Sequence, residues 1–153
     1  LRNNSAMLEN DSNHLDCLQN IEEAGIRPVT KISDDHWQLS MSNDAGSYEL
    51  DIKDQDPWYT YGAQLLPPVE GDHLDEFHRF VLEINSFLNG AKIGIEADNS
   101  LVIVSEEPKS FASAPTIYES ISSFNEAHRY AYREVISKAA ALELKFKDGV
   151  EIY

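Results

Sequence analysis

The stretch Gly90–Glu107, GAKIGIEADNSLVIVSEE, decides the interpretation of the whole chain, because it reads as two short strands joined by a turn. Ile93 and Ile95 alternate with small or charged residues, which is typical of a strand with one buried face. Asp98 and Asn99 have the side chains that tight reversals favour. The stretch therefore predicts a β-hairpin.

The return strand of this hairpin is apolar on both faces over residues 101–104. Successive side chains of a strand point to opposite faces, so only one of its two apolar rows can fill the core. Either Leu101 and Ile103 or Val102 and Val104 then face outward, and the sequence leaves both arrangements open.

Three more strands are predicted before this hairpin, over residues 36–42, 47–53 and 58–66. The breaks between them, NDAG and KDQDP, are too short for parallel crossovers, so we expect an antiparallel meander. The expected inward rows are Trp37, Leu39 and Met41; Tyr48, Leu50 and Ile52; and Tyr59, Tyr61, Ala63 and Leu65.

Helical patterns precede, divide and follow the strands. A short helix is expected from Ser12, a second from a cap at Asp72 to just before Gly90, and a long third from a cap at Ser113 to Ala141. The order is α-βββ-α-ββ-α, which predicts an α+β fold: an antiparallel sheet, built from a three-strand meander and a hairpin, with helices packed on it.

The length of 153 residues fits one domain. We expect residues 1–11 to be a flexible lead-in and residues 12–153 to form a single α+β domain. A hairpin extension is expected from about residue 142, with its turn at Asp148 and Gly149. Because the chain begins at Leu1 without an initiator methionine, we expect a processed product, with room for a removed leader.

The net charge is −15, from 27 acidic and 12 basic residues. Such a field repels phosphate backbones and anionic lipid surfaces, which argues against nucleic-acid and membrane binding. No apolar run approaches the ~20 residues of a membrane span. The single cysteine, Cys17, excludes an intrachain disulfide, so we expect a cytoplasmic protein in a reducing compartment.

The residues that could form catalytic or metal-binding motifs do not have the sequence spacing that such motifs require. His73 and His78 are five residues apart and do not share a helical face, and the acidic run Asp54–Asp56 precedes a proline and is typical of a turn. We therefore expect no enzyme activity, no cofactor and no metal. An enzyme whose site is assembled across the sheet stays open as an alternative.

Binding is the remaining function class, and the outward rows supply its candidates. If Tyr59 and Tyr61 face inward, Trp58 faces outward, together with Glu49, Asp51 and one apolar row of the hairpin. The candidate partner-binding residues are Trp58, Val102, Val104, Glu49 and Asp51. Together they would form an apolar patch with acidic residues around it, which fits a protein or peptide partner. The alternative is that the tail hairpin or a helix covers them.

The second helix has more apolar surface than one sheet face needs. Phe80 and Phe87 widen its apolar stripe, so we expect Phe80, Ile84 and Phe87 to support self-association as a homodimer. A broad core-facing helix is the alternative.

The order of elements resembles the type III secretion chaperone-like fold, and within it the YbjN-type branch, over residues 12 to about 140. The resemblance implies small, acidic, cytoplasmic, usually dimeric proteins that bind polypeptides without catalysis. Its secretion branch wraps unfolded effector segments and dimerises through the second helix, whereas a YbjN-type regulatory protein would act on a folded partner. The tail hairpin and the turn ADNS depart from the pattern. The residues that support the resemblance are Asn85, Ile93, Ile95, Asp98, Leu101–Val104 and Phe124.

Overall fold

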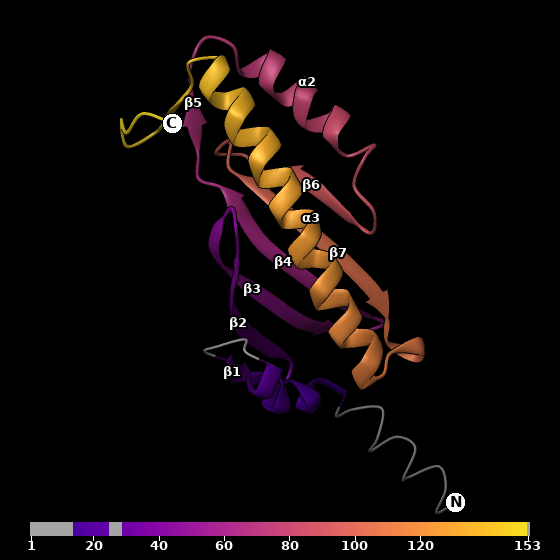
Figure 1. Cartoon of the computed structure of the whole chain (residues 1–153). Helices are drawn as coiled ribbons and strands as arrows, with labels where there is room; N and C mark the ends of the chain where they lie inside the picture. The colour runs from indigo at the N-terminus through magenta and orange to yellow at the C-terminus, as the bar shows by residue number, and fades with distance from the viewer. Residues whose placement is uncertain (1–13, 25–28, 153) are drawn as a thin grey trace, which may run out of the picture.

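The computed structural model describes residues 14–24 and 29–152, and in this part of the chain an antiparallel six-stranded sheet supports two α-helices (Figure 1). The strand order is β1-β2-β3-β4-β7-β6. The strands are β1 (Val29–Ser33), β2 (His36–Asn43), β3 (Gly46–Gln55), β4 (Trp58–Leu66), β6 (Ala91–Ile95) and β7 (Leu101–Pro108). The helices are η1 (His14–Ala24), α2 (Leu74–Ile84), η2 (Lys109–Phe111) and α3 (Ala114–Ala141). The predicted α+β architecture is confirmed.

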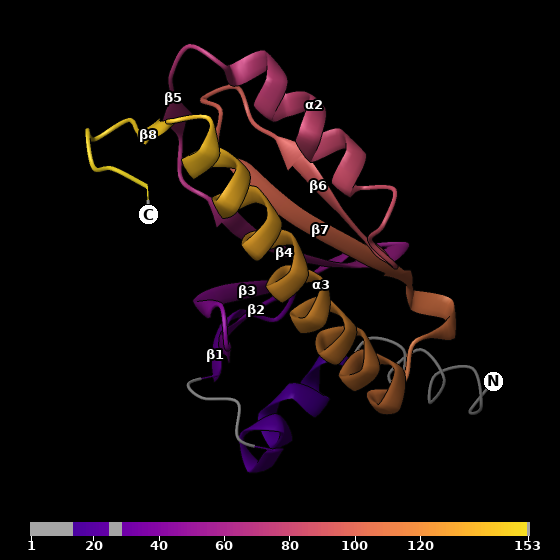
Figure 2. The ribbon, with the colours of Figure 1, turned by 45° about the horizontal axis from the view of Figure 1, so that its top comes forward.

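The core lies between one face of the sheet and the helices. Figures 1 and 2 show α3 lying across that face, with α2 beside it at the β6 end. Every residue of the predicted inward rows of β2, β3 and β4 is buried except Tyr48, which is partly buried and packs against the core. In the hairpin Ile93 is buried as expected, but Ile95 at the end of β6 is 37% exposed. The strict alternation of β2, β3 and β4 therefore fixed which face they bury.

The meander contains one strand more than the sequence predicts. β1 precedes the three expected strands and pairs antiparallel with β2, from Val29 opposite Leu39 to Ser33 opposite His36. Its sequence, VTKIS, is mostly exposed, because an edge strand with one neighbour needs little apolar surface. Because β1 has no row of buried side chains, its sequence shows no alternation of apolar and polar residues from which a strand could be predicted.

The hairpin of β6 and β7 has the predicted turn, with Asn99 at a positive φ of 69°. The main-chain N–H of Ser100 donates to the Asp98 carboxylate at 2.9 Å, and hydrogen bonding to Ser100 lowers the pKa of this carboxyl. Leu101 and Ile103 are buried, whereas Val102 and Val104 lie on the opposite face. The arrangement that the sequence left open is thereby resolved.

Helix α2 begins later and ends earlier than predicted. His73, not Asp72, occupies the N-cap position, and regular helix stops at Ile84. The chain then turns back because the side chain of Asn85 bonds both main-chain groups of Ile93: its Nδ2 donates to the Ile93 oxygen at 3.0 Å, and its Oδ1 accepts from the Ile93 nitrogen at 2.7 Å. Asn85 thus occupies part of the free edge of β6.

Helix α3 begins with the predicted cap and ends at the predicted residue. Ser113 and Thr116 form a capping box, in which Ser113 Oγ accepts from the Thr116 nitrogen and Thr116 Oγ1 accepts from the Ser113 nitrogen. Its buried stripe contains Ile117, Phe124 and Val135, as expected. The 28 residues of α3 span about 42 Å, so one helix reaches across the whole sheet.

The first helix is a 3-10 helix whose buried side chains, Leu15, Leu18 and Ile21, recur every three residues. Its predicted start at Ser12, and the predicted lead-in over residues 1–11, lie outside the described residues. At the other end of the chain, β8 (Lys145–Phe146) pairs with β5 (Val69–Glu70) in a separate two-stranded sheet. The turn at Asp148 and Gly149 follows β8 and brings Glu151 back opposite Lys145.

Candidate partner-binding face of the sheet

The face of the sheet that points away from α3, here called the open face, is covered by no element of the described part of the chain. One row of side chains crosses it through directly opposed residues of five strands. The row consists of Gln38, Asp51, Gly62, Val104 and Lys92. All five are partly or fully exposed.

The open face is hollowed at its centre by a groove of about 630 Å³. Gly62 in β4 lies in its floor, and Gly94 in β6 lies opposite Val102 on the same face. A Cβ atom added at Gly62 would lie 3.8 Å from Val104 Cγ1, in ordinary contact, so the space above Gly62 is empty for lack of a side chain. The groove is lined by Asp51, Lys53, Gln55, Thr60, Tyr61, Gly62, Ala63, Gln64, Gly90, Lys92, Glu96, Val102, Val104, Ser105 and Glu106.

The charges in the groove are mixed. Asp51, Glu96 and Glu106 are acidic, and the sequence analysis missed that Lys53 and Lys92 also line it. The sequence pattern could have shown this, because Lys53 on β3 and Lys92 on β6 alternate with the inward-facing residues of their strands and must therefore point to the open face. The open face is therefore acidic only locally.

The two predicted acidic residues are held by neighbours on β2. His36 Nε2 lies 2.7 Å from Asp51 Oδ1, and Gln38 Nε2 donates to the same oxygen at 3.3 Å. Ser40 Oγ donates to Glu49 Oε1 at 2.8 Å. These cross-strand bonds orient both carboxylates along the open face.

The predicted apolar residues do not form one patch. Val102 and Val104 are neighbours on β7, and Val104 is 46% exposed. Trp58 is 38% exposed and lies four residues before Gly62 on β4, roughly 13 Å along the strand at ~3.3 Å per residue. The tail hairpin pairs with β5 and leaves these residues uncovered.

The residues predicted for self-association separate in the structure. Ile84 is 4% exposed and belongs to the core, and Phe80 is partly buried, with Lys138 Nζ 5.4 Å from its ring centre. Phe87 is 69% exposed, and Leu82, which the sequence analysis did not select, is also exposed. Because α2 packs with Phe77, Val81 and Ile84 inward, its exposed apolar surface is shifted from the predicted one.

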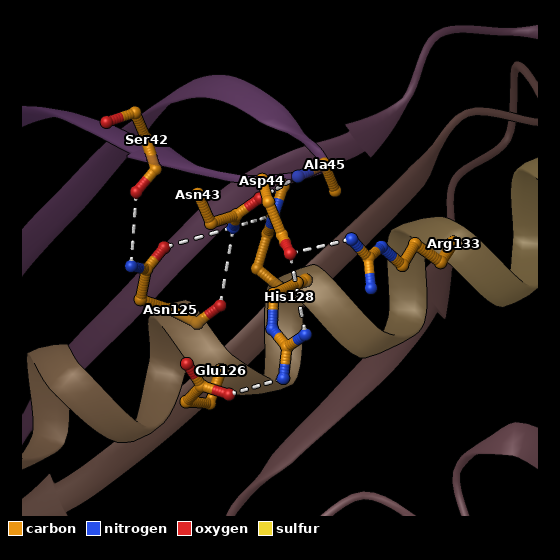
Figure 3. Close-up of polar contacts among 9 residues, drawn as sticks. Ser42, Asn43, Asp44, Ala45, Asn125, Glu126, His128 and Arg133 are labelled. Atoms are coloured by element: carbon orange, nitrogen blue, oxygen red, sulfur yellow. Dashed lines mark hydrogen bonds and ion pairs between the residues drawn. The ribbon is translucent and has the colours of Figure 1, made fainter.

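A polar cluster that the sequence analysis missed joins the tip of the β2–β3 hairpin to α3 (Figure 3). Asn43 Nδ2 donates to Asn125 Oδ1 at 3.1 Å and lies 3.3 Å from His128 Nδ1. The ring of His128 stacks on that of Tyr48, with centroids 3.7 Å apart. Burial lowers the pKa of His128 to about 4, so the imidazole is neutral at pH 7. The pairing joins residues more than 80 positions apart, so no local pattern shows it.

Groups that could be reactive are held in unreactive states. Burial raises the pKa of the Cys17 thiol, which disfavours the nucleophilic thiolate. Burial, and then the hydrogen bond to the Glu107 carboxylate, raise the pKa of Tyr61. Within residues 14–24 and 29–152, no three His, Cys, Asp or Glu side chains gather as a metal site requires.

In the same part of the chain, every helix is too short or too polar to traverse a lipid bilayer.

Solved structures supply the comparison that decides the fold. A chain of the heterodimeric ExoU–SpcU complex from the type III secretion system of Pseudomonas aeruginosa is similar with a TM-score of 0.52 at 16% identity, over 74% of this chain and 93% of that chain. A chain of the HopA1–SchA chaperone–effector complex is similar with a TM-score of 0.50 at 16% identity, over 74% of this chain and 87% of that chain. The fold is that of the type III secretion chaperones.

No protein-family model matches the chain. No curated protein matches it either. At 16% identity the type III secretion chaperone likeness concerns the path of the backbone, and the function has to be argued from the residues of the open face.

Proposed function

We propose that this protein is a non-catalytic, chaperone-like polypeptide-binding protein that holds its partner on the open face of the sheet. The main support is the groove over Gly62, which no described element fills and which Val102 and Val104 flank with apolar surface. Apolar surface in a groove with polar groups around it is the usual composition of a protein-binding site. Two structural neighbours are heterodimeric or chaperone–effector complexes, which agrees with this role.

The acidic residues complement this proposal. With a net charge of −15, the molecule attracts basic polypeptides and repels nucleic acids and anionic membranes. We place its action in the cytoplasm, where a lone cysteine stays reduced. In this proposal residues 12–153 act as a single domain, and the hairpin extension from about residue 142 lies away from the groove.

We further propose that two copies associate through the outer surface of α2 and the turn after it. Leu82 and Phe87 expose large apolar side chains there, and the exposed Tyr130 of α3 lines a second hollow together with Phe87. Burying such side chains contributes roughly 1.5–3 kcal/mol each. Phe80 takes part only at its exposed edge, and Ile84 supports the surface from within the core.

A YbjN-type regulatory protein that binds a folded partner is the alternative. It would use the same open face, but its partner would present a preformed surface in place of an extended segment. The mixed charges of the groove, with Lys53 and Lys92 opposite acidic residues, are the feature that favours it, because folded surfaces present both signs.

A substitution that fills the groove tests the proposal. Gly62→Val places side-chain atoms over the groove floor, and its Cβ meets only ordinary contacts, so we expect a folded protein of at least equal stability. Polypeptides that copurify with the wild type from its native cell should be lost, as read by affinity capture and mass spectrometry. Ser137→Val, on the exposed surface of α3, is the control and should retain them.

Trp58→Ala in the same experiment separates the two apolar parts of the open face. We expect partial loss of captured polypeptide if the partner extends from the groove to the end of β4. Unchanged capture by both Gly62→Val and Trp58→Ala would refute binding at the open face.

A further inference from the structure

Strands β3 and β4 pair along only half of their length. Their ladder runs from the pair Gln55 and Trp58 to the pair Asp51 and Gly62 and then stops. Continued in the same register, it would bring Glu49 opposite Gln64. β3 continues to pair with β2, and β4 continues to pair with β7, so the sheet divides here into two branches. We call the gap between the branches the fork.

Main-chain groups point into the fork. A two-residue turn joins Gln55 to Trp58, and the residues that flank such a turn exchange hydrogen bonds. Hydrogen-bonded pairs alternate along an antiparallel ladder, so Ser47 and Glu49 on β3 and Gln64 on β4 aim their N–H and C=O groups at the missing partner strand. A segment of extended chain placed there would find strand edges on both sides.

Fixed contacts hold the fork apart. On the β3 side, the hairpin tip is tied to α3: Asn125 Nδ2 donates to the Ser42 main-chain oxygen at 3.3 Å, and the Asp44 carboxylate lies 2.8 Å from Arg133 Nη2 (Figure 3). On the β4 side, the register with β7 shifts between Gln64 and Leu66, and Pro67 follows. The β3 branch is therefore anchored to α3, and the β4 branch changes its pairing with β7 where the fork opens.

The fork contains a cavity of about 550 Å³ with aromatic rings on the α3 side and carboxylates on the open face. Tyr48 stacks on His128, and Tyr132 stacks beyond it with centroids 6.1 Å apart and planes at 8°. Glu49 and Asp51 also line the cavity, and none of its lining residues is a lysine or arginine. The carboxylates attract a cationic side chain that a bound segment directs to the open face.

We propose that the fork binds an extended basic segment of the polypeptide partner, which adds as a short strand between β3 and β4 and places a lysine or arginine side chain against Glu49 on the open face. This rests on the proposed polypeptide-binding function and adds to it a second contact site and the charge of the bound segment. Main-chain hydrogen bonds supply sequence-independent affinity, and the side-chain pocket supplies selectivity.

Titration of isotope-labelled protein with two short capped peptides, one alternating valine with lysine and one alternating valine with glutamate, tests the inference by amide NMR. The lysine peptide should shift the amide signals of Ser47, Glu49 and Gln64 and slow their hydrogen exchange, and the glutamate peptide should not. Glu49→Gln should weaken binding of the lysine peptide about 2–5-fold, the range of an exposed ion pair. Glu119→Gln, at an exposed carboxylate of α3 outside both the groove and the fork, should leave it unchanged.

Three outcomes overturn the inference: no shift with either peptide, equal shifts with both, or lysine-peptide shifts confined to Val102, Val104 and Lys92. The third outcome would leave the proposed function standing, because it places the peptide in the groove. Partner capture that is lost in Gly62→Val yet unchanged in Glu49→Lys would likewise place the partner in the groove and overturn binding at the fork. Failure of the proposed function itself would show as unchanged capture in both Gly62→Val and Trp58→Ala.

Discussion

At the scale of single residues, His128 shows how a buried polar group ties two distant elements. It is 4% exposed and lies between Tyr48 and Tyr132, with Asn43 on its Nδ1. Burial keeps it neutral in the folded protein, with a pKa lowered from 6.5 to about 4. In the unfolded chain it takes up a proton as the pH falls below about 6.5.

The stability of the protein should therefore fall between pH 6.5 and about 4. The contribution of neutral His128 is fully present above pH 6.5 and is lost as the pH falls through the lowered pKa, a loss of up to about 3 kcal/mol. Urea unfolding followed by tryptophan fluorescence measures it. In His128→Phe, which keeps a stacked ring without a titrating group, this part of the pH dependence should vanish; an unchanged pH dependence would contradict the assignment.

A second prediction at this scale concerns Asn85. Its amide satisfies both main-chain groups of Ile93, so Asn85→Ala should lower the free energy of unfolding by about 1–3 kcal/mol and leave the β6 edge unpaired at that point. Asn89→Ala, at an exposed asparagine just before Gly90, is the matched control and should change it little. Equal effects of the two substitutions in a denaturant titration would argue against this role of Asn85.

At the scale of elements, α2 and the turn after it present Leu82 and Phe87 to solvent, and the proposed homodimer depends on them. Phe87→Arg should convert a dimer to a monomer with little loss of stability, because the side chain is 69% exposed. Light scattering coupled to size exclusion measures the mass. Phe111→Arg, at an exposed phenylalanine in η2, should leave it unchanged, and a wild-type protein that stays monomeric at high concentration would refute the dimer.

The elements also differ in how far the sequence determined them. Period-two alternation was sufficient for β2, β3 and β4, because their inward rows are buried. It was not sufficient for the hairpin, where it left the two apolar rows of β7 undecided and where Ile95 is exposed. Alternation did not predict β1, because almost none of its side chains are buried. Capping chemistry located α3 well, whereas α2 ended early because Asn85 bonds to β6, a tertiary contact.

At the scale of the whole molecule, the sequence predicted the fold better than the candidate site. The alternation of outward residues placed Glu49 and Asp51 on one face but left open which apolar row of the hairpin joins them. The groove depends on the absence of a side chain at Gly62, and the fork depends on where the ladder between β3 and β4 stops. Contacts such as Asp44 with Arg133, which tie the β2–β3 hairpin to α3, join distant segments. Local patterns contain no information on such contacts.

Site-specific photo-crosslinking tests the central claim, binding of a polypeptide at the open face, most directly. A photoreactive phenylalanine analogue placed at Val104, which is exposed in the groove, should crosslink to another polypeptide in the native cell. The same analogue at Glu119, exposed on α3 across the sheet, is the control. The account predicts adducts at position 104 and none at 119; no adduct at 104, or the same adducts at both positions, would contradict it.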